Sequence, residues 1–289
     1  MSGARGLLLL TLGVGLALAF GLALGSAEHT TRSILIDIRL PRVLLGAFVG
    51  AGLATAGALL QALLRNPLAD PYILGISGGA ALGGVLALAF AGGLGLGGPI
   101  VPVAAFGGAL AATALLHAIA GREGMPRHSL LLTGVVFNAF AGSLIVFLTA
   151  AVDLSRVAGI FLWLIGSIRP TSLPVLGAVA LLLGAGIGIG LRDAYSLNLL
   201  SLGDESAAQL GVEVQRVRRR ILFGTSLMIG AAVAVSGLVG FVGLIVPHLL
   251  RGAGGADHRW LVPASALGGA AFVVVADTLA RTLLSPAEL

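Results

Sequence analysis

Long apolar runs, separated by short polar segments, fill most of this 289-residue chain. A helix of about 20 apolar residues, rising 1.5 Å per residue, crosses the ~30 Å hydrocarbon core of a bilayer. Only 10% of the residues are charged, against about 25% in soluble domains, and the mean hydropathy is +1.07. The sequence therefore predicts a polytopic helical membrane protein with lipid as its main solvent.

Nine segments are apolar enough to be interpreted as spans, one of them short, and they predict an all-α transmembrane helical bundle. The nine are Leu7–Ala27, Val43–Leu64, Ile73–Ala91, Pro99–Ala120, Leu130–Ala150, Leu173–Leu191, Ile221–Ser236, Gly240–Leu250 and Leu261–Leu284. The first exceeds the ~7–15-residue apolar core of a signal peptide, so it is expected to be retained. A further apolar segment, Ser155–Ile168, is short and predicts a re-entrant or interfacial helix. We expect one transmembrane domain, residues 1–289.

The arginines favour a cytoplasmic N-terminus. All 17 basic residues are arginines, and basic residues accumulate in the cytoplasmic loops of membrane proteins. With the N-terminus inside, eleven arginines fall on the inner side: Arg5, Arg65, Arg122, Arg127, Arg192, Arg216, Arg218, Arg219, Arg220, Arg251 and Arg259. The other six fall outside: Arg32, Arg39, Arg42, Arg156, Arg169 and Arg281. The inverted topology would reverse this bias.

The chain contains neither cysteine nor lysine. Disulfides, thiolate metal sites and the phosphate-binding loop, which requires a lysine, are therefore excluded. If the protein uses ATP, another chain must bind it. The five histidines show no metal-ligand spacing, and no pair of nucleophile and base is evident, so neither a metal site nor an enzyme is expected. The net charge of +5 does not predict nucleic-acid binding, because the arginines lie in short segments between helices.

A polar stretch with two prolines, RNPLADPYILGISGG, separates the second and third predicted spans. Pro67 and Pro71 end one helix and delay the next, since proline lacks an N–H and restricts the residue before it. Asp70 is expected to cap the amides of the following helix. Together with Arg65 and Asn66, these residues predict a tight cytoplasmic turn.

The longest polar region, residues 192–220, is also predicted to be cytoplasmic. Within it, Gly203 to Gly211 resembles a short helix with acids in its first turn and glycine as its stop. A helix of two turns is unstable alone in water and needs a surface to pack against. Two interpretations remain open: an amphipathic loop lying on the membrane, or a docking surface for a soluble partner.

Two further polar features allow alternative roles. Asn138, in the middle of the fifth predicted span, either bonds a neighbouring helix or lines a transport pathway. Arg39, Arg42 and Arg281 lie near the outer ends of their spans. They either extend toward lipid headgroups or form a positive rim that pairs with carboxylates of a partner outside the cell.

Four stretches resemble the permease subunits of the FecCD/BtuC family, which are type II ABC importers of iron–siderophores, haem and cobalamin. They are RLPRVLLGAFVGAGLATAGALLQALLRNPLADPYILGISGGAALG (residues 39–83), LGDESAAQLGVEV (202–214), SGLVGFVGLIVPHLLR (236–251) and DHRWLVPASALGGAAFVVVADTLAR (257–281). The resemblance covers the chain from about residue 30 to its end.

The resemblance implies functional roles for the polar features described above. Arg39, Arg42 and Arg281 match arginines that meet glutamates of a periplasmic binding protein. The residues Gly203, Asp204, Glu205, Ala207, Ala208, Leu210 and Gly211 match the coupling region that contacts the ATPase subunit. The turn residues Arg65, Asn66, Pro67, Asp70 and Pro71 match the family's signature turn beside it.

The resemblance also implies a working complex in the bacterial inner membrane. It would contain a homodimer of permeases, two ATPase subunits that bind ATP and Mg²⁺, and a periplasmic binding protein. This chain would bind no cofactor of its own. The expected cargo is a ferric siderophore or haem, with cobalamin as the alternative. Family members have ten spans, so with nine predicted here the C-terminal helix is expected to be truncated.

An ion-coupled secondary transporter is the alternative from another class. Such proteins place ionisable groups inside their spans as coupling sites. Asp277 is the only carboxylate well inside a predicted span, and it lies near the outer end. This position argues against ion coupling.

Overall fold

The computed structural model describes residues 3–24, 32–72, 74–90, 100–120 and 127–283. All of its regular elements in these ranges are helices, as the hydropathy predicts. Three predicted span ends, Ala27, Ala91 and Leu284, lie outside the described residues, as do the predicted starts at Ile73 and Pro99.

Seven described helices are long and apolar enough to cross a membrane, judged by length and composition. They are α1 (Gly3–Ala23), α2 (Leu40–Leu64) with the π-helical turn η1 (Ile34–Arg39) at its start, α4 (Ile100–Ala120), α5 (Arg127–Ala151), α7 (Leu173–Leu202), α9 (Val214–Ser236) and α11 (His258–Leu283). The predicted count of nine spans is therefore not confirmed.

The other helices are short. α3 (Ile76–Phe90) and α10 (Val242–Gly254) occupy two of the predicted spans but have only 15 and 13 residues. At 1.5 Å per residue they reach about 22 and 20 Å, less than a hydrocarbon core of ~30 Å. α6 (Leu154–Ile165) has 12 residues, in line with the short helix expected there, and α8 (Asp204–Gln209) has six.

Both short apolar helices begin inside the bundle rather than at its end. Near the start of α3, Gly79 lies against Gly108, close to the middle of α4. At the start of α10, Gly243 lies against Gly57, well inside α2. The segments leading to these helices therefore run back into the bundle before the helix starts.

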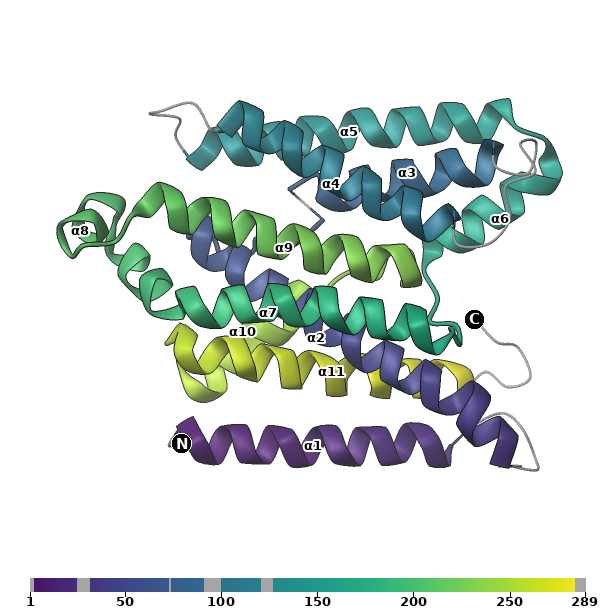
Figure 1. Ribbon diagram of the computed structural model, residues 1–289, viewed down its shortest axis with the longest axis horizontal. Coiled ribbons are helices and arrows are strands. Elements are labelled where there is room, and N and C mark those ends of the chain that lie inside the picture. The colour runs from purple at the N-terminus through teal and green to yellow at the C-terminus, as the bar shows by residue number, and fades with distance from the viewer. Residues whose placement is uncertain (1–2, 25–31, 73, 91–99, 121–126, 284–289) are drawn as a thin grey trace.

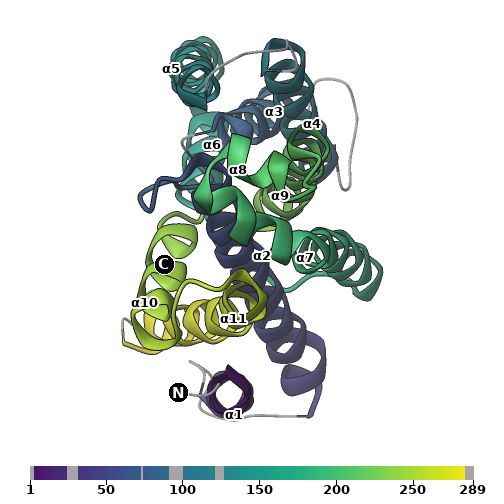
Figure 2. The ribbon, with the colours of Figure 1, turned by 90° about the vertical axis from the view of Figure 1, so that its left-hand side faces the viewer.

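Helix α2 forms the centre of the molecule, with α7, α9, α10 and α11 packed around it (Figure 2). Twenty of its 25 residues are buried. Apart from Arg42, Thr55 and Gln61 its residues are apolar, and it carries no continuous polar face. This is the pattern of a helix surrounded by other helices. By contrast, α1 lies at the edge of the bundle beside α11 (Figure 1).

Glycine allows the central helices to touch. A Cβ at Gly50 would overlap the carbonyl oxygen of Gly269 in α11, and a Cβ at Gly57 would overlap Gly243. Small residues of this kind bring backbones together where lipid removes the usual drive for association. A four-residue spacing of glycines does not by itself identify such contacts. Gly184 and Gly188 have that spacing, yet a Cβ at either would meet nothing within 4 Å.

The two ends of the bundle carry different elements. The start of α1 and the short helix α8 lie at the same end (Figure 1). Gly3 contacts Trp260 at the start of α11, whereas Gly21 contacts Thr278 near its end, so α1 and α11 run parallel. We call the end that carries α8 the coupling end and the other the distal end.

Candidate coupling and docking sites

Helix α8 lies between two glycines that other residues replace poorly. The φ angles are 136° at Gly203 and 85° at Gly211, both in the region that favours glycine. Ala207 is fully buried against the bundle, whereas Glu205, Ala208 and Leu210 are exposed. Ala207 therefore packs α8 against the bundle, while Glu205, Ala208 and Leu210 lie at its surface.

Ion pairs join α8 to the predicted turn. The Asp204 carboxylate accepts a hydrogen bond from Arg218 of α9 at 3.0 Å and lies 3.4 Å from the Arg65 guanidinium. Arg65 also donates through Nε to the carbonyl oxygen of Leu200 at 2.8 Å. The two sequence features that were assigned separately, at Arg65 and at Gly203–Gly211, thus form one cluster, which we call the Asp204 cluster.

The turn after α2 begins as predicted. Arg65 ends the helix in a left-handed conformation, with φ 49° and ψ 37°. The Asn66 side chain then accepts the amide of Leu68 at 3.0 Å. Such local side-chain bonds are typical of asparagine in turns. Arg65 and Pro67 are exposed, so this part of the turn lies at the surface of the coupling end.

The second half of the turn differs from expectation. Asp70 and Pro71 are buried, because the chain runs inward toward the start of α3. Asp70 was expected to cap that helix, but its carboxylate accepts the amide of Tyr72 at 2.8 Å, four residues before α3 begins. The carbonyl of Pro71 accepts the hydroxyl of Ser77 at 3.2 Å.

Asn138 bonds a neighbouring segment. Its Nδ2 donates to the carbonyl oxygen of Tyr72, which lies in the inward-running half of the turn. The polar side chain in mid-helix therefore satisfies a backbone group that has no helical partner. Of its two predicted roles, the bond to another segment is present, and a pathway role stays a prediction.

The three predicted docking arginines lie close together at the distal end. Arg42 meets Asp277 through two nitrogens, with Nη2 to Oδ1 at 3.0 Å and Nε to Oδ2 at 3.2 Å. Arg281 lies 3.6 Å from the same carboxylate. Arg39 donates to the carbonyl oxygen of Leu22 at 3.0 Å.

These arginines already have partners within the chain. Arg39 and Arg281 are each only 5% exposed, and Arg281 donates to the carbonyl oxygen of Gly21. Both therefore satisfy carbonyls in the last turn of α1, which have no partners in their own helix. Their docking to a binding protein stays a prediction. The structure adds that they fasten α1 to α2 and α11.

Sequence reasoning missed several polar partners. Asp277, four residues before Arg281, was noted only as an argument against ion coupling, although the i, i+4 spacing of the two residues could have predicted the pair. Gln61 donates to the carbonyl oxygen of Gly243 at 3.0 Å and accepts a hydrogen bond from Arg251. No local pattern identifies that link, which joins residues far apart in the chain.

A second polar cluster, at the start of α11, was also missed. Asn198 donates to the Asp257 carboxylate at 2.7 Å, and its oxygen accepts the backbone amide of His258 at 2.9 Å. The Arg259 guanidinium and the Asn198 amide hold the pKa of Asp257 well below its usual range. These bonds tie the end of α7 to the start of α11.

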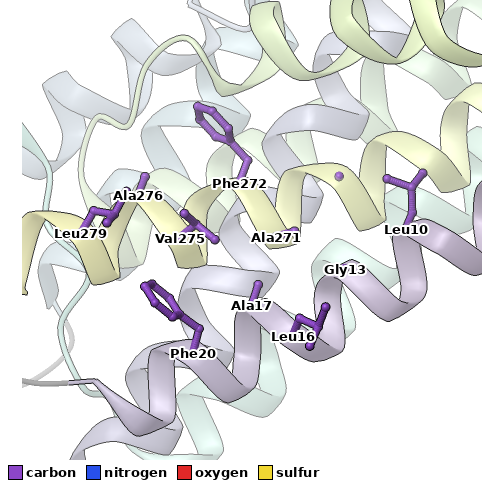
Figure 3. A pocket seen from close by; sticks show the side chains of 11 residues that line it. Leu10, Gly13, Leu16, Ala17, Phe20, Ala271, Phe272, Val275, Ala276 and Leu279 are labelled. Carbon is purple, nitrogen blue, oxygen red and sulfur yellow. The ribbon is translucent and has the colours of Figure 1, made fainter.

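An apolar groove of about 840 Å³ runs between α1 and α11 (Figure 3). Leu16 and Phe20 line it from α1, and Phe272, Val275 and Leu279 from α11. Its lining carries no polar side chain, so the groove offers no charged or hydrogen-bonding side chain to a polar ligand.

The described residues hold no cluster of three or more His, Asp or Glu side chains that could bind a metal ion. The expected absence of a metal site was based on the lack of cysteine and on the spacing of the histidines.

Comparison with known proteins identifies a single family over nearly the whole chain. The model of the FecCD transport family matches residues 5–289. The hemin transport system permease HmuU of Yersinia pestis is 44% identical over 268 residues, covering 89% of this chain and 77% of HmuU. The cobalamin import system permease BtuC of Halobacterium salinarum is 42% identical over 274 residues, covering 94% of this chain and 72% of that protein.

A solved structure has the same fold. It is described as a metal-chelate type ABC transporter in an inward-facing conformation. Its chain superposes with a TM-score of 0.90 at 32% identity, covering 100% of this chain and 93% of that one. The overall helical arrangement is therefore shared with a protein of known structure.

Proposed function

The chain belongs to the FecCD transport family of ABC-importer permeases, and from that premise we propose that it carries an iron chelate across a bacterial inner membrane. The cargo would be haem or a ferric siderophore. Relatives described as hemin and metal-chelate transporters support this choice. Cobalamin is the alternative cargo, supported by a cobalamin permease of similar identity.

The permease would work within a larger complex. Two copies would form the pathway, a periplasmic binding protein would deliver the chelate, and ATPase subunits holding ATP and Mg²⁺ would supply the energy. The N-terminus and α8 would face the cytoplasm. The arginine distribution supports this orientation, because most arginines fall on that side.

The Asp204 cluster carries the mechanistic part of the proposal. An ATPase that displaced α8 would act on Asp204, whose ion pairs reach Arg65 at the end of α2 and Arg218 at the start of α9. From Arg65 the turn continues to Tyr72, which is bonded to Asn138 in the middle of α5. Movement at the coupling end would therefore bias the arrangement of three helices.

The proposed function predicts ATP-driven uptake by the reconstituted complex. The permease, its cognate ATPase and its cognate binding protein would be placed in proteoliposomes, and uptake of haem, a ferric siderophore and cobalamin compared. We expect uptake of one iron chelate, dependent on ATP and on the binding protein. Uptake driven by an ion gradient without the ATPase would overturn the importer assignment. Uptake of cobalamin alone would overturn only the cargo.

The same vesicles test the role of the Asp204 cluster. Asp204→Asn removes the charge shared by Arg65 and Arg218 and should lower the amount of chelate taken up per ATP hydrolysed. Glu213→Gln is the matched control, because it removes the exposed ion pair of Glu213 and Arg216 at 2.6 Å near the same helix. Equal ratios for both variants would show that the Asp204 cluster does not transmit movement.

A further inference from the structure

A small polar pocket of about 220 Å³ opens at the coupling end. Its polar walls come from four helix ends or the residues next to them: Gln61 and Arg65 at the end of α2, Ser201 of α7, Arg251 of α10 and His258 of α11. Two arginines line it, and no carboxylate does. The pocket lies outside the Gly203–Gly211 segment that the family resemblance assigns to ATPase contact.

Both arginines have N–H donors that make no hydrogen bond to the described residues. Arg251 is half-buried, and its only hydrogen-bond partner among the described residues is Gln61, reached through Nη1. Its Nε and Nη2 therefore lack acceptors in that part of the chain. Arg65 uses Nε and Nη2 for Leu200 and Asp204, which leaves Nη1 without a partner there. Guanidinium donors of this kind bind carboxylate or phosphate oxygens.

The neighbouring imidazole of His258 is held by a hydrogen bond with Asn198. Asp257 accepts the NH₂ group of Asn198, which turns the Asn198 oxygen toward His258. The Nδ1 of His258 lies 2.7 Å from that oxygen and must therefore carry the proton. The two arginines give the pocket its permanent positive charge.

The size and position of the pocket restrict its occupant. Sites for drug-sized ligands measure ~300–1,000 Å³, so this pocket suits a single anionic group rather than a nucleotide or a chelate. It lies where the end of α2 meets the end of α7, the last part of α10 and the start of α11. Arg65 and Ser201, which line it, are exposed, so a group can enter it from the surface of the coupling end. The pocket also adjoins α8, because its lining residue Arg65 binds both Asp204 of α8 and the carbonyl oxygen of Leu200 in α7.

We propose that this pocket receives an acidic side chain of the ATPase subunit that docks on α8. The inference rests on the proposed function and adds a second anchoring point to it. A carboxylate between Arg251 and Arg65 would compete with Asp204 for the Arg65 guanidinium. Docking would thereby loosen α8 from the end of α2 at the moment the partner binds.

The first test measures binding of the cognate ATPase to the full-length permease in detergent. Arg251→Gln removes the charge but keeps an amide that can still bond Gln61, and it should weaken binding by about 30-fold, with the loss mainly in the dissociation rate. Arg251→Lys should bind at an intermediate level, because it keeps the charge without the forked geometry. Arg192→Gln is the control, an exposed arginine of α7 outside the pocket, and should change binding little.

The second test does not depend on the stability of an arginine variant. The chain has no cysteine, so Ser201→Cys gives a unique thiol at the exposed wall of the pocket, and its labelling rate by a maleimide can be followed. We expect the ATPase to protect this thiol, and inorganic phosphate or phosphatidylglycerol vesicles to leave it reactive. Protection by phosphate alone or by vesicles alone would overturn the proposal in favour of a free anion or a lipid headgroup.

The outcomes separate this inference from the proposed function. An ATPase that fails to bind even the unaltered permease would overturn the proposed function. An ATPase that binds the unaltered permease and Arg251→Gln equally, and protects Ser206→Cys on α8 but not Ser201→Cys, would overturn the pocket alone. Equal losses for Arg251→Gln and Arg192→Gln would reduce the effect to general charge and would also overturn it.

Discussion

At the scale of single residues, Asp277 shows how a carboxylate can stabilise a cluster of cations in a mostly apolar protein. Arg42 and Arg281 both lie against it, and all three side chains are at most 15% exposed. Unpaired charges at this depth are costly, so the carboxylate compensates two guanidinium groups at once. These contacts join α2 to α11, and separate bonds from Arg39 and Arg281 hold the end of α1 beside them.

The first prediction concerns this carboxylate. Asp277→Asn removes the carboxylate charge that Arg42 and Arg281 share and should destabilise the permease by about 2 kcal/mol, between the values typical of surface and buried pairs. The measurement is the midpoint of thermal unfolding in detergent. Asp153→Asn is the control, since Asp153 is exposed and its side chain makes no capping bond. A midpoint for Asp277→Asn equal to that of the control would contradict the stabilising role.

Residues also show what the sequence leaves open. Motif and hydropathy place Arg42 and Arg281 near the outer ends of their helices, but they do not reveal that one carboxylate lies between them. The prediction that Asn138 bonds another segment was available from its position in mid-span. Its partner, the Tyr72 carbonyl, could not be predicted, because the inward course of the turn is a tertiary property.

At the scale of elements, the crossing of α2 and α11 depends on the absence of side chains. Gly50 and Gly269 are close enough that a methyl group on either would overlap the backbone of the other helix. Interiors packed at this density respond to a single added carbon. The crossing therefore fixes the separation of the two helices.

The second prediction follows from that crossing. Gly50→Ala should lower the free energy of unfolding by about 1–3 kcal/mol, because α2 and α11 must move apart. Gly184→Ala, where the added carbon meets nothing within 4 Å, should be neutral or stabilise by up to about 1 kcal/mol through helix propensity. Thermal unfolding of both variants in detergent gives the comparison. A Gly50→Ala protein as stable as Gly184→Ala would show that the two helices are free to separate.

Hydropathy predicted the existence of most elements but not their depth. The segments at Ile73–Ala91 and Gly240–Leu250 are apolar enough to be interpreted as spans, yet they form α3 and α10, which start well inside the bundle. An apolar pattern reports that a segment avoids water, and a segment buried among other helices satisfies it as well as one that crosses lipid. Pro67 and Pro71 indicate that the helix ends, but they do not indicate the direction that the following segment takes.

At the scale of the whole molecule, the ordered set of four motifs predicted both the family and the fold, because each motif occupies a distinct structural position. The stretches at residues 39–83 and 202–214 meet in the Asp204 cluster, and the stretch at 236–251 supplies the glycine that touches α2. The spatial meeting of these stretches is not visible in the sequence. The contacts between these stretches require all of them to be present in one chain.

The third prediction tests the orientation of the molecule. Because the chain has no cysteine, single replacements at Ser206 on α8 and at Ser172 before α7 report the two ends independently. Both positions are exposed. In right-side-out vesicles a membrane-impermeant maleimide should label Ser172→Cys and spare Ser206→Cys, and in inverted vesicles the pattern should be reversed. Labelling of Ser206→Cys from outside would place the coupling end in the periplasm and contradict the proposed topology.

The central position of α2 has a consequence for the order in which the protein is assembled. This helix emerges early in synthesis, yet the glycines it touches, Gly243 and Gly269, come near the end of the chain. At ~5–20 residues per second, about 10–40 s separate the emergence of Gly50 from that of its counterpart. During that interval the face of α2 that carries Gly50 and Gly57 lacks its partners in α10 and α11. Before α10 and α11 are made, α2 would therefore be accessible to quality-control proteases, although it becomes the most central helix of the finished permease.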